Sequence, residues 1–165
     1  MTENNTETEK IERKLIETDE EITKKANIWQ RIWAVQSEVK PLIKDELNKF
    51  QNYKYFEEEQ VLKVLNPLLK KYRLGVILSE NVNVPVVYEE KEKQINIKYQ
   101  KRLELINIDK PDEKLEYFYN VGGNNQDLAK VKGSAETYAT KYILSKFFLI
   151  RVIDENEPEK QVIKK

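Results

Sequence analysis

Apolar residues recur at helical spacing in three stretches of the chain. The first covers residues 26–50, where Pro41 is expected to kink or split the helix because proline lacks an N–H and clashes with the preceding turn. The second covers residues 56–72 and has one apolar face. The third covers residues 128–150. Its predicted core stripe consists of Leu128, Val131, Ala135, Tyr138, Tyr142 and Leu149, and it is widened by Ala139, Ile143, Phe147 and Ile150.

Between the second and third helices the apolar residues alternate with polar ones, which predicts β-strands. Residues 76–88 form either one long strand or two strands joined by a turn, because Pro85 indicates a sheet edge or an irregularity. Residues 95–105 and 115–121 are predicted to form a hairpin, since the sequence Asp-Lys-Pro-Asp between them is typical of a turn.

The order of these elements predicts an α+β fold. It consists of N-terminal helices, a three-stranded antiparallel β-meander and a long C-terminal helix, which follows a loop at residues 122–125. Residues 26–153 are predicted to form the single domain. Residues 1–25 are predicted to be an acidic, mobile or weakly helical segment, and residues 154–165 a polar tail.

The net charge of zero conceals a segregation of charge along the chain. Residues 1–25 carry eight acidic and five basic residues, whereas residues 26–153 carry twenty-one basic and seventeen acidic residues. A mildly basic centre between acidic ends fits a nucleic-acid binder. The alternative is an ordinary solvated surface.

Several residue types are absent, and their absence argues against much enzyme chemistry. The chain has no cysteine and no histidine, which excludes disulfides, thiol nucleophiles, the usual zinc sites and a histidine general base. None of its four glycines belongs to a phosphate-binding loop. Asp109 and Asp112 could in principle hold a metal, but they flank Lys-Pro and a turn explains them better. We therefore predict no catalytic residue, no metal and no cofactor.

The chain contains no apolar run long enough to cross a membrane, and its acidic N-terminus lacks the basic start and apolar centre of a signal peptide. The expected location is the cytoplasm, without a membrane partner.

Two groups of cationic residues are candidates for contact with phosphate. On the third helix, Lys130, Ser134, Thr137 and Lys141 share one face, with Lys132 to one side. On the polar face of the second predicted strand lie Lys98 and Arg102. The alternatives are a solvated helix face and a solubilising sheet face. Tyr138 and Tyr142 could stack on bases, although their position favours core packing.

The segment Gly133–Tyr142, with the sequence GSAETYATKY, resembles the signature helix of the Erf (essential recombination function) family of phage-type single-strand DNA annealing proteins. Residues 44–74 and 105–111 are similar to further stretches of that family in order and spacing. The resemblance implies a strand-strand-strand-helix core, with DNA in a basic groove beside the N-terminal helices. It also implies that Lys44, Lys54, Tyr55 and Lys141 bind DNA.

The function implied is ATP-independent binding of single-stranded DNA and annealing of complementary strands in recombination, in the cytoplasm of a bacterial host. The expected partners are single-stranded DNA, the annealed duplex intermediate and further copies of the chain in a ring or helical filament, with a phage exonuclease or a host single-strand binding protein as additional candidates. Alternatives are a passive protein that protects single strands and an oligomeric scaffold without a DNA role.

Overall fold

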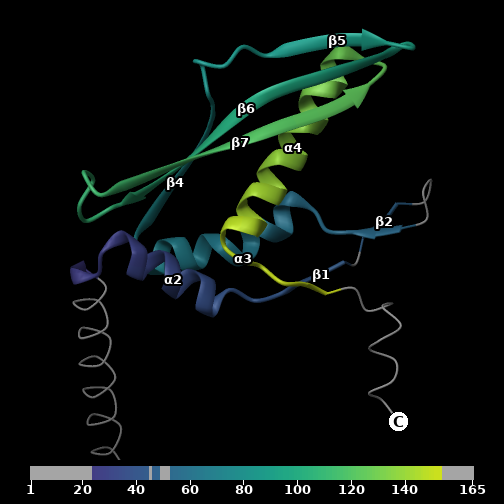
Figure 1. Cartoon of the computed structure of the whole chain (residues 1–165). Coiled ribbons are helices and arrows are strands. Elements are labelled where there is room, and N and C mark those ends of the chain that lie inside the picture. The colour runs from purple at the N-terminus through teal and green to yellow at the C-terminus, as the bar shows by residue number, and fades with distance from the viewer. Residues whose placement is uncertain (1–23, 45, 49–52, 154–165) are drawn as a thin grey trace, which may run out of the picture.

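The computed structural model describes residues 24–44, 46–48 and 53–153, with three helices and eight strands in these ranges (Figure 1). The predicted α+β class is confirmed. None of the described helices has the length and hydropathy needed to span a membrane. The helices are α2 (Ile28–Glu38), α3 (Glu58–Lys71) and α4 (Leu128–Phe147), and the strands are β1 (Leu42–Ile43), β2 (Glu46–Asn48), β3 (Tyr53–Tyr55), β4 (Leu74–Glu80), β5 (Val87–Lys91), β6 (Gln94–Asn107), β7 (Lys114–Asn125) and β8 (Val152–Ile153).

Strand β6 is the centre of the main sheet, and all its partners run antiparallel to it. β7 follows the whole of one edge, while β4 and β5 share the other edge. Glu80 pairs with Lys101 and Val87 pairs with Lys98, so residues 81–86 form an interruption between two short strands. The three-stranded meander is therefore confirmed in part: its first strand is divided in two, and the sheet has four strands.

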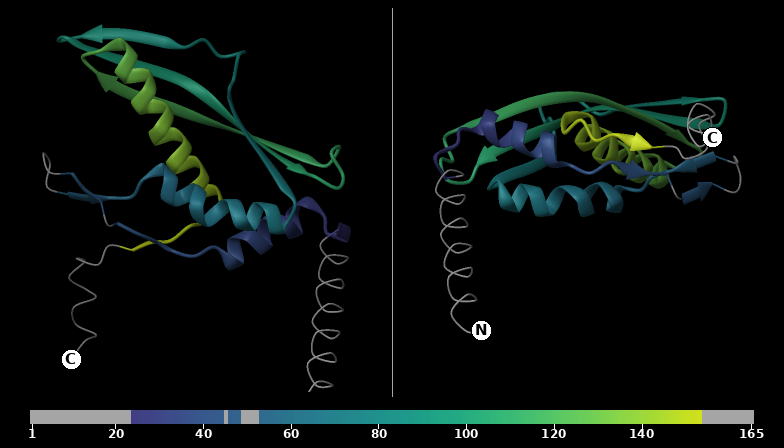
Figure 2. Two further views of the ribbon diagram at one scale, coloured as in Figure 1. Left: turned by 180° about the vertical axis from the view of Figure 1, so that it is seen from behind. Right: turned by 90° about the horizontal axis from the view of Figure 1, so that it is seen from below.

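Helix α4 crosses one face of this sheet, and α2 and α3 lie near its C-terminal end (Figures 1 and 2). Asp127 begins α4, because its Oδ1 accepts a hydrogen bond from the Ala129 N–H at 2.9 Å. Alternate residues of β6 face the helix and are buried, as their period of two requires. The buried side chains of the core include Ile32, Val35, Val61, Leu65, Leu103, Leu105, Val131, Ala135, Ala139, Ile143 and Phe148.

The prediction that Pro41 kinks or splits a helix was wrong for the residues after the proline, which are not helical where the structure describes them. Helix α2 ends at Glu38, and Leu42–Ile43 forms β1, which pairs in parallel with β8 from the other end of the chain. The Leu42 N–H donates to the Arg151 carbonyl at 2.8 Å. Proline disfavours helical backbone at the residue before it, so this segment is extended and pairs with a distant strand. The predicted helical position Phe50 lies outside the described residues.

Two further predictions about the second half of the chain were wrong, the second of them only in part. Residues 122–125 are not a loop but the end of β7, where pairing with β6 outweighs the turn preference of glycine and asparagine. The predicted core stripe of the last helix is right for its smaller residues, since Val131, Ala135, Ala139, Ile143 and Ile150 are buried. It is wrong for four of its larger residues, which lie on the side that the sheet does not cover. The exposed residues are Leu128, Tyr138, Tyr142 and Leu149.

The two terminal segments proposed from the sequence lie almost wholly outside the described residues, and the division into segment, domain and tail stays a prediction.

A buried arginine joins the helical part of the fold to the β6–β7 turn. The Arg31 side chain donates to the carbonyls of Ala26, Tyr72 and Arg73 at 3.0 to 3.2 Å, and its Nη2 lies 2.9 Å from Asp109 Oδ2. Arg73 Nη2 also lies 2.6 Å from Asp109 Oδ1. Hydrogen bonds from Arg73 and then Arg31 lower the pKa of Asp109 to about 2. Asp109 therefore has a structural role in this turn.

We expect Asp109→Asn to lower the free energy of unfolding at pH 7 by roughly 1–3 kcal/mol, because it leaves two guanidinium groups without their carboxylate. A carboxyl group with a lowered pKa stabilises the fold above its unfolded pKa of about 3.9, and this contribution is lost as the pH falls toward about 2. The difference in the free energy of unfolding between Asp109→Asn and wild type, measured by urea unfolding, should therefore shrink below about pH 4. The exposed Asp112 in the same turn provides the control, Asp112→Asn, and an equal loss in both variants would contradict the assignment.

Candidate functional site

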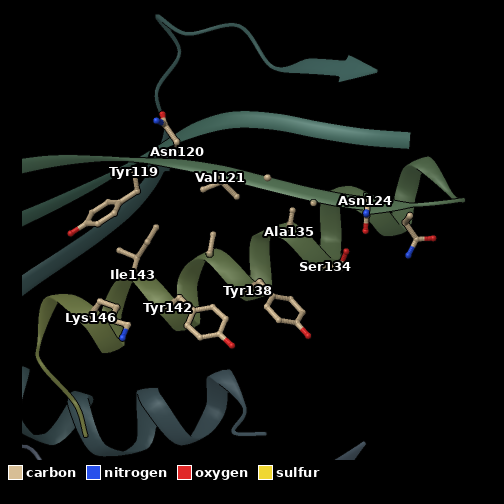
Figure 3. Close-up of a pocket in the computed structure, with 14 residues that line it drawn as sticks. Tyr119, Asn120, Val121, Asn124, Ser134, Ala135, Tyr138, Tyr142, Ile143 and Lys146 are labelled. Atoms are coloured by element: carbon tan, nitrogen blue, oxygen red, sulfur yellow. The ribbon is translucent and has the colours of Figure 1, made fainter. Parts of the chain in front are cut away.

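A groove of about 830 Å³ runs between strand β7 and helix α4 (Figure 3). No described strand pairs with the outer edge of β7, so its last residues border open space. Asn124 and Ser134 lie near one end of the groove and Lys146 lies at the other (Figure 3). The lining residues are Tyr119–Asn125, Ser134, Ala135, Tyr138, Ala139, Tyr142, Ile143 and Lys146.

The groove depends on a close approach of α4 to β7. A Cβ atom added at Gly123 would lie 3.1 Å from Ala135 Cβ, which is tighter than ordinary van der Waals contact. Gly122 faces the other way, and a Cβ there would have its nearest neighbour at 3.5 Å. Position 123 is therefore tightly packed against α4, whereas position 122 has ordinary room for a side chain.

Two tyrosines of α4 border the groove side by side (Figure 3). The rings of Tyr138 and Tyr142 are stacked, with centroids 5.9 Å apart and planes inclined by 26°. Both are nearly half exposed, at 48% and 45%, and Tyr142 also makes an edge contact with Phe56. Exposed aromatic faces of this kind accept a planar ligand such as a nucleobase without selecting its sequence.

The polar lining of the groove is rich in amides and hydroxyls. Asn124 and Asn125 lie at one end of the lining, Ser134 contributes a hydroxyl, and Lys146 is the one charged residue among the lining residues. Asn120 points away from α4 (Figure 3), and its Oδ1 accepts from Gln100 Nε2 at 3.2 Å. Amides can donate and accept hydrogen bonds, which suits the edges of bases as well as phosphate oxygens. This lining accommodates a polar, flat ligand better than an ion.

Lys141 does not lie on the solvated face that the sequence suggested. Its side chain is buried, and its Nζ donates to the Phe56 carbonyl at 3.0 Å. The rings of Tyr55, Phe56, Tyr138 and Tyr142 have their centroids 4.6 to 5.7 Å from Nζ, so the ammonium group sits among aromatic faces. Lys141 thus holds the exposed tyrosines against the segment that precedes α3. A direct contact with phosphate stays a prediction.

Three of the predicted residues come together beside Lys141. Tyr55, Thr137 and Lys141 line a smaller groove of about 300 Å³, which shares Tyr138 with the first. The Thr137 hydroxyl donates to the Gly133 carbonyl at 3.2 Å and keeps its acceptor capacity. The two grooves therefore meet at the stacked tyrosines.

Lys132 belongs to a network of ion pairs between α4 and the sheet. Its Nζ lies 2.7 Å from Glu80 Oε1 and 2.7 Å from Glu136 Oε1, and it stands 3.8 Å from the centre of the Tyr99 ring. Glu136 also pairs with the buried Lys101. Burial would raise the pKa of Glu136, but hydrogen bonds from Lys101, Lys132 and Tyr99 outweigh it and bring the pKa to about 2.

The two predicted cations of β6, Lys98 and Arg102, lie on the face away from α4 and have carboxylate partners. Lys98 Nζ is 3.4 Å from Glu89, and Arg102 lies 2.7 Å from Glu104 and 2.9 Å from Glu116. They are not brought into the groove. Any phosphate that binds on this face competes with these carboxylates.

The remaining predicted residues lie elsewhere. Lys130 is exposed in the first turn of α4, 3.9 Å from Asp127. Lys44 follows β1 and is half-buried. Lys54 is in β3, and its side chain lies outside the described residues. Among the described residues there is no group of acidic side chains suited to a metal ion.

Sequence reasoning missed the asparagines of β7 and Lys146, and it assigned Tyr138 and Tyr142 to the core. The alternation of Asn120, Gly122 and Asn124 with Val121 was a usable signal for a strand. The exposure of the tyrosines could not be inferred from spacing, because it depends on which side of α4 the sheet covers.

We expect Gly123→Val to lower the free energy of unfolding by about 1–3 kcal/mol, because its methyl groups would push α4 away from β7. Gly122→Val, the matched control, should change it by no more than about 0.5 kcal/mol. Urea unfolding followed by circular dichroism measures both. Equal stability of the two variants would show that α4 does not approach the strand at Gly123.

A search of curated proteins found no match to the chain. One family model does match, over residues 28–164, and it is described as ERF superfamily.

Proposed function

This chain belongs to the ERF superfamily, and we propose that it binds single-stranded DNA and anneals complementary strands without ATP, as an oligomer. Membership of the family supports a role in phage recombination by single-strand annealing. The proposal extends this to ATP independence, to assembly and to the residues concerned.

The observation that carries the proposal is the pair of stacked, half-exposed tyrosines at the meeting point of two grooves. A stacked aromatic pair offers a sequence-independent surface for unpaired bases. A base in a duplex is already stacked on its neighbours and is not available to such a surface. The site therefore favours single strands.

Phosphate contacts would come from cations around the grooves and on the sheet. Lys146 lines the main groove, and the sequence-based candidates Lys44, Lys54, Lys98, Arg102, Lys130, Lys132 and Lys141 remain proposals, with Tyr55 and Thr137 between them. Such contacts gain affinity through release of counterions and carry no sequence information. Watson–Crick pairing with a second strand then supplies the specificity, so the protein needs neither sequence-specific contacts to the bases nor ATP hydrolysis.

Two other functions remain as alternatives. A passive binder would cover single strands and slow their pairing. An oligomeric scaffold without a DNA role would show little affinity for oligonucleotides and little dependence on salt.

The first test mixes two complementary oligonucleotides with the full chain in the absence of ATP and follows duplex formation by fluorescence quenching. We expect pairing to become faster than for DNA alone. A slower reaction would identify the passive binder, and an unchanged rate without binding would identify the scaffold.

The second test replaces Tyr138 and Tyr142 by leucine, which keeps apolar volume but removes the aromatic faces. The double variant should bind oligo-dT more weakly by about 1–3 kcal/mol for each base that stacks, measured by fluorescence anisotropy. Its affinity for an abasic oligonucleotide of the same length should equal that of wild type. Tyr88→Leu, at an exposed tyrosine of β5 outside both grooves, is the control. An equal loss on abasic DNA would exclude base stacking.

A further inference from the structure

Helix α2 turns two tryptophans to solvent. Trp29 and Trp33 are one turn apart, and their side chains are 58% and 70% exposed, although buried residues elsewhere on α2 anchor it to the core. Beside Trp33 lies a mainly apolar hollow of about 430 Å³, which Ala34 and Tyr72 also line. Taking about 250 Å² for a tryptophan side chain, the two rings leave about 300 Å² open.

The segment that follows α4 adds a third exposed apolar side chain, Leu149. Gln36 lies on the same side of α2 as Trp33, and its Nε2 donates to the Phe147 carbonyl at 2.8 Å. Two residues later, Leu149 is 66% exposed. We call Trp29, Trp33 and Leu149 the tryptophan face. Its residues belong to α2 and to the segment that follows α4, and the hydrogen bond from Gln36 to Phe147 joins these two parts.

The backbone of Leu149 is strained. Its φ of 54° is left-handed, and it stands where a helix C-terminus usually has glycine, with the Ile150 N–H donating to the Ser145 carbonyl at 2.8 Å. Arg73 has the same conformation after α3, with φ 52°, and there its side chain pairs with Asp109. Leu149 projects into solvent instead. In a single chain it costs free energy at the backbone and gains little from burial.

A second copy of this chain fits the tryptophan face better than nucleic acid does. A standard protein interface buries about 800 Å² on each partner, of which rather more than half is apolar, and the two rings with Leu149 supply most of such a centre. Lys25 and Arg31 also line the hollow, but Arg31 lies 2.9 Å from Asp109, and the nearby Lys71 lies 2.8 Å from Glu38, so these two cations already have carboxylate partners. The chain has a net charge of zero, and two copies therefore meet without net repulsion.

We propose that the tryptophan face packs against a second copy of this chain. The inference deepens the proposed function, since it rests on the assembly included there and identifies the surface that forms it. This proposal also explains why position 149 holds leucine, although glycine at its left-handed backbone position would make the monomer more stable.

The chain has only these two tryptophans, so its intrinsic fluorescence reports directly on the proposed interface. With rising concentration of the full chain, the emission should shift to shorter wavelength and acrylamide should quench it less. The mass from sedimentation velocity should rise over the same concentration range. Emission that stays at long wavelength while the mass stays that of one chain would overturn the proposal.

Leu149→Gly separates an interface role from a structural one. The variant should unfold at a higher urea concentration, because the strain is relieved, and should associate about tenfold more weakly or worse. Leu128→Ala, at an exposed leucine of α4 away from the face, should leave association unchanged. A Leu149→Gly variant that associates as wild type does would overturn the proposal.

Two other outcomes would also overturn it. Short-wavelength emission at every concentration with the mass of one chain would mean that residues 1–23 cover the face. Quenching by oligo-dT without a change in mass would mean that the face binds nucleic acid.

The same samples keep this inference distinct from the proposed function. If assembly is weakened by Leu149→Gly but the wild-type chain does not anneal strands, only the proposed function is contradicted. If the Leu149→Gly variant assembles as wild type does and still anneals strands, only this inference is contradicted.

Discussion

The antiparallel pairing of β6 along both of its edges is the interaction on which the rest of the structure depends. One edge binds β7 throughout, the other binds β4 and β5 in succession, and the buried side supports α4. Because β6 pairs with β7 along almost its whole length, β7 extends to Asn125 and brings Asn124 and Asn125 to the end of the groove. The main groove is a consequence of this length, since it forms where the outer edge of β7 has no described partner.

The close packing of small residues then determines which side chains remain available to a ligand. Gly123 and Ala135 let α4 lie against the strand, so the bulky residues on the neighbouring side of the helix are left at the surface. Lys141, held by a carbonyl and surrounded by aromatic rings, keeps two of them in a fixed arrangement. The surface between the grooves is thus aromatic, with the buried ammonium group of Lys141 behind its rings. Many of the cations around it already have carboxylate partners.

The sequence was a good guide wherever the relevant contact is local or follows a simple period. Alternation of apolar residues predicted β6 and the hairpin with β7, and helical spacing predicted α3 and α4 to within a few residues. It failed where the partner is remote, as for Leu42–Ile43 with β8 and for the end of β7 with the beginning of β6. It also failed for Lys141 and the tyrosines, because spacing gives the faces of a helix but not the one that the rest of the protein covers. A lysine buried among aromatic rings has no signature in spacing or charge.

The parallel pairing of Leu42 with Val152 has a consequence for how the protein folds during its synthesis. The N–H groups of Leu42 and Lys44 donate to the carbonyls of Arg151 and Ile153, which are among the last described residues to be made. Contacts between such distant parts of a chain form slowly, and here they have to wait for translation to reach the C-terminal strand. Until then the segment after α2 lacks its hydrogen-bonding partner. Completion of the native fold therefore has to wait for the synthesis of residues 151–153.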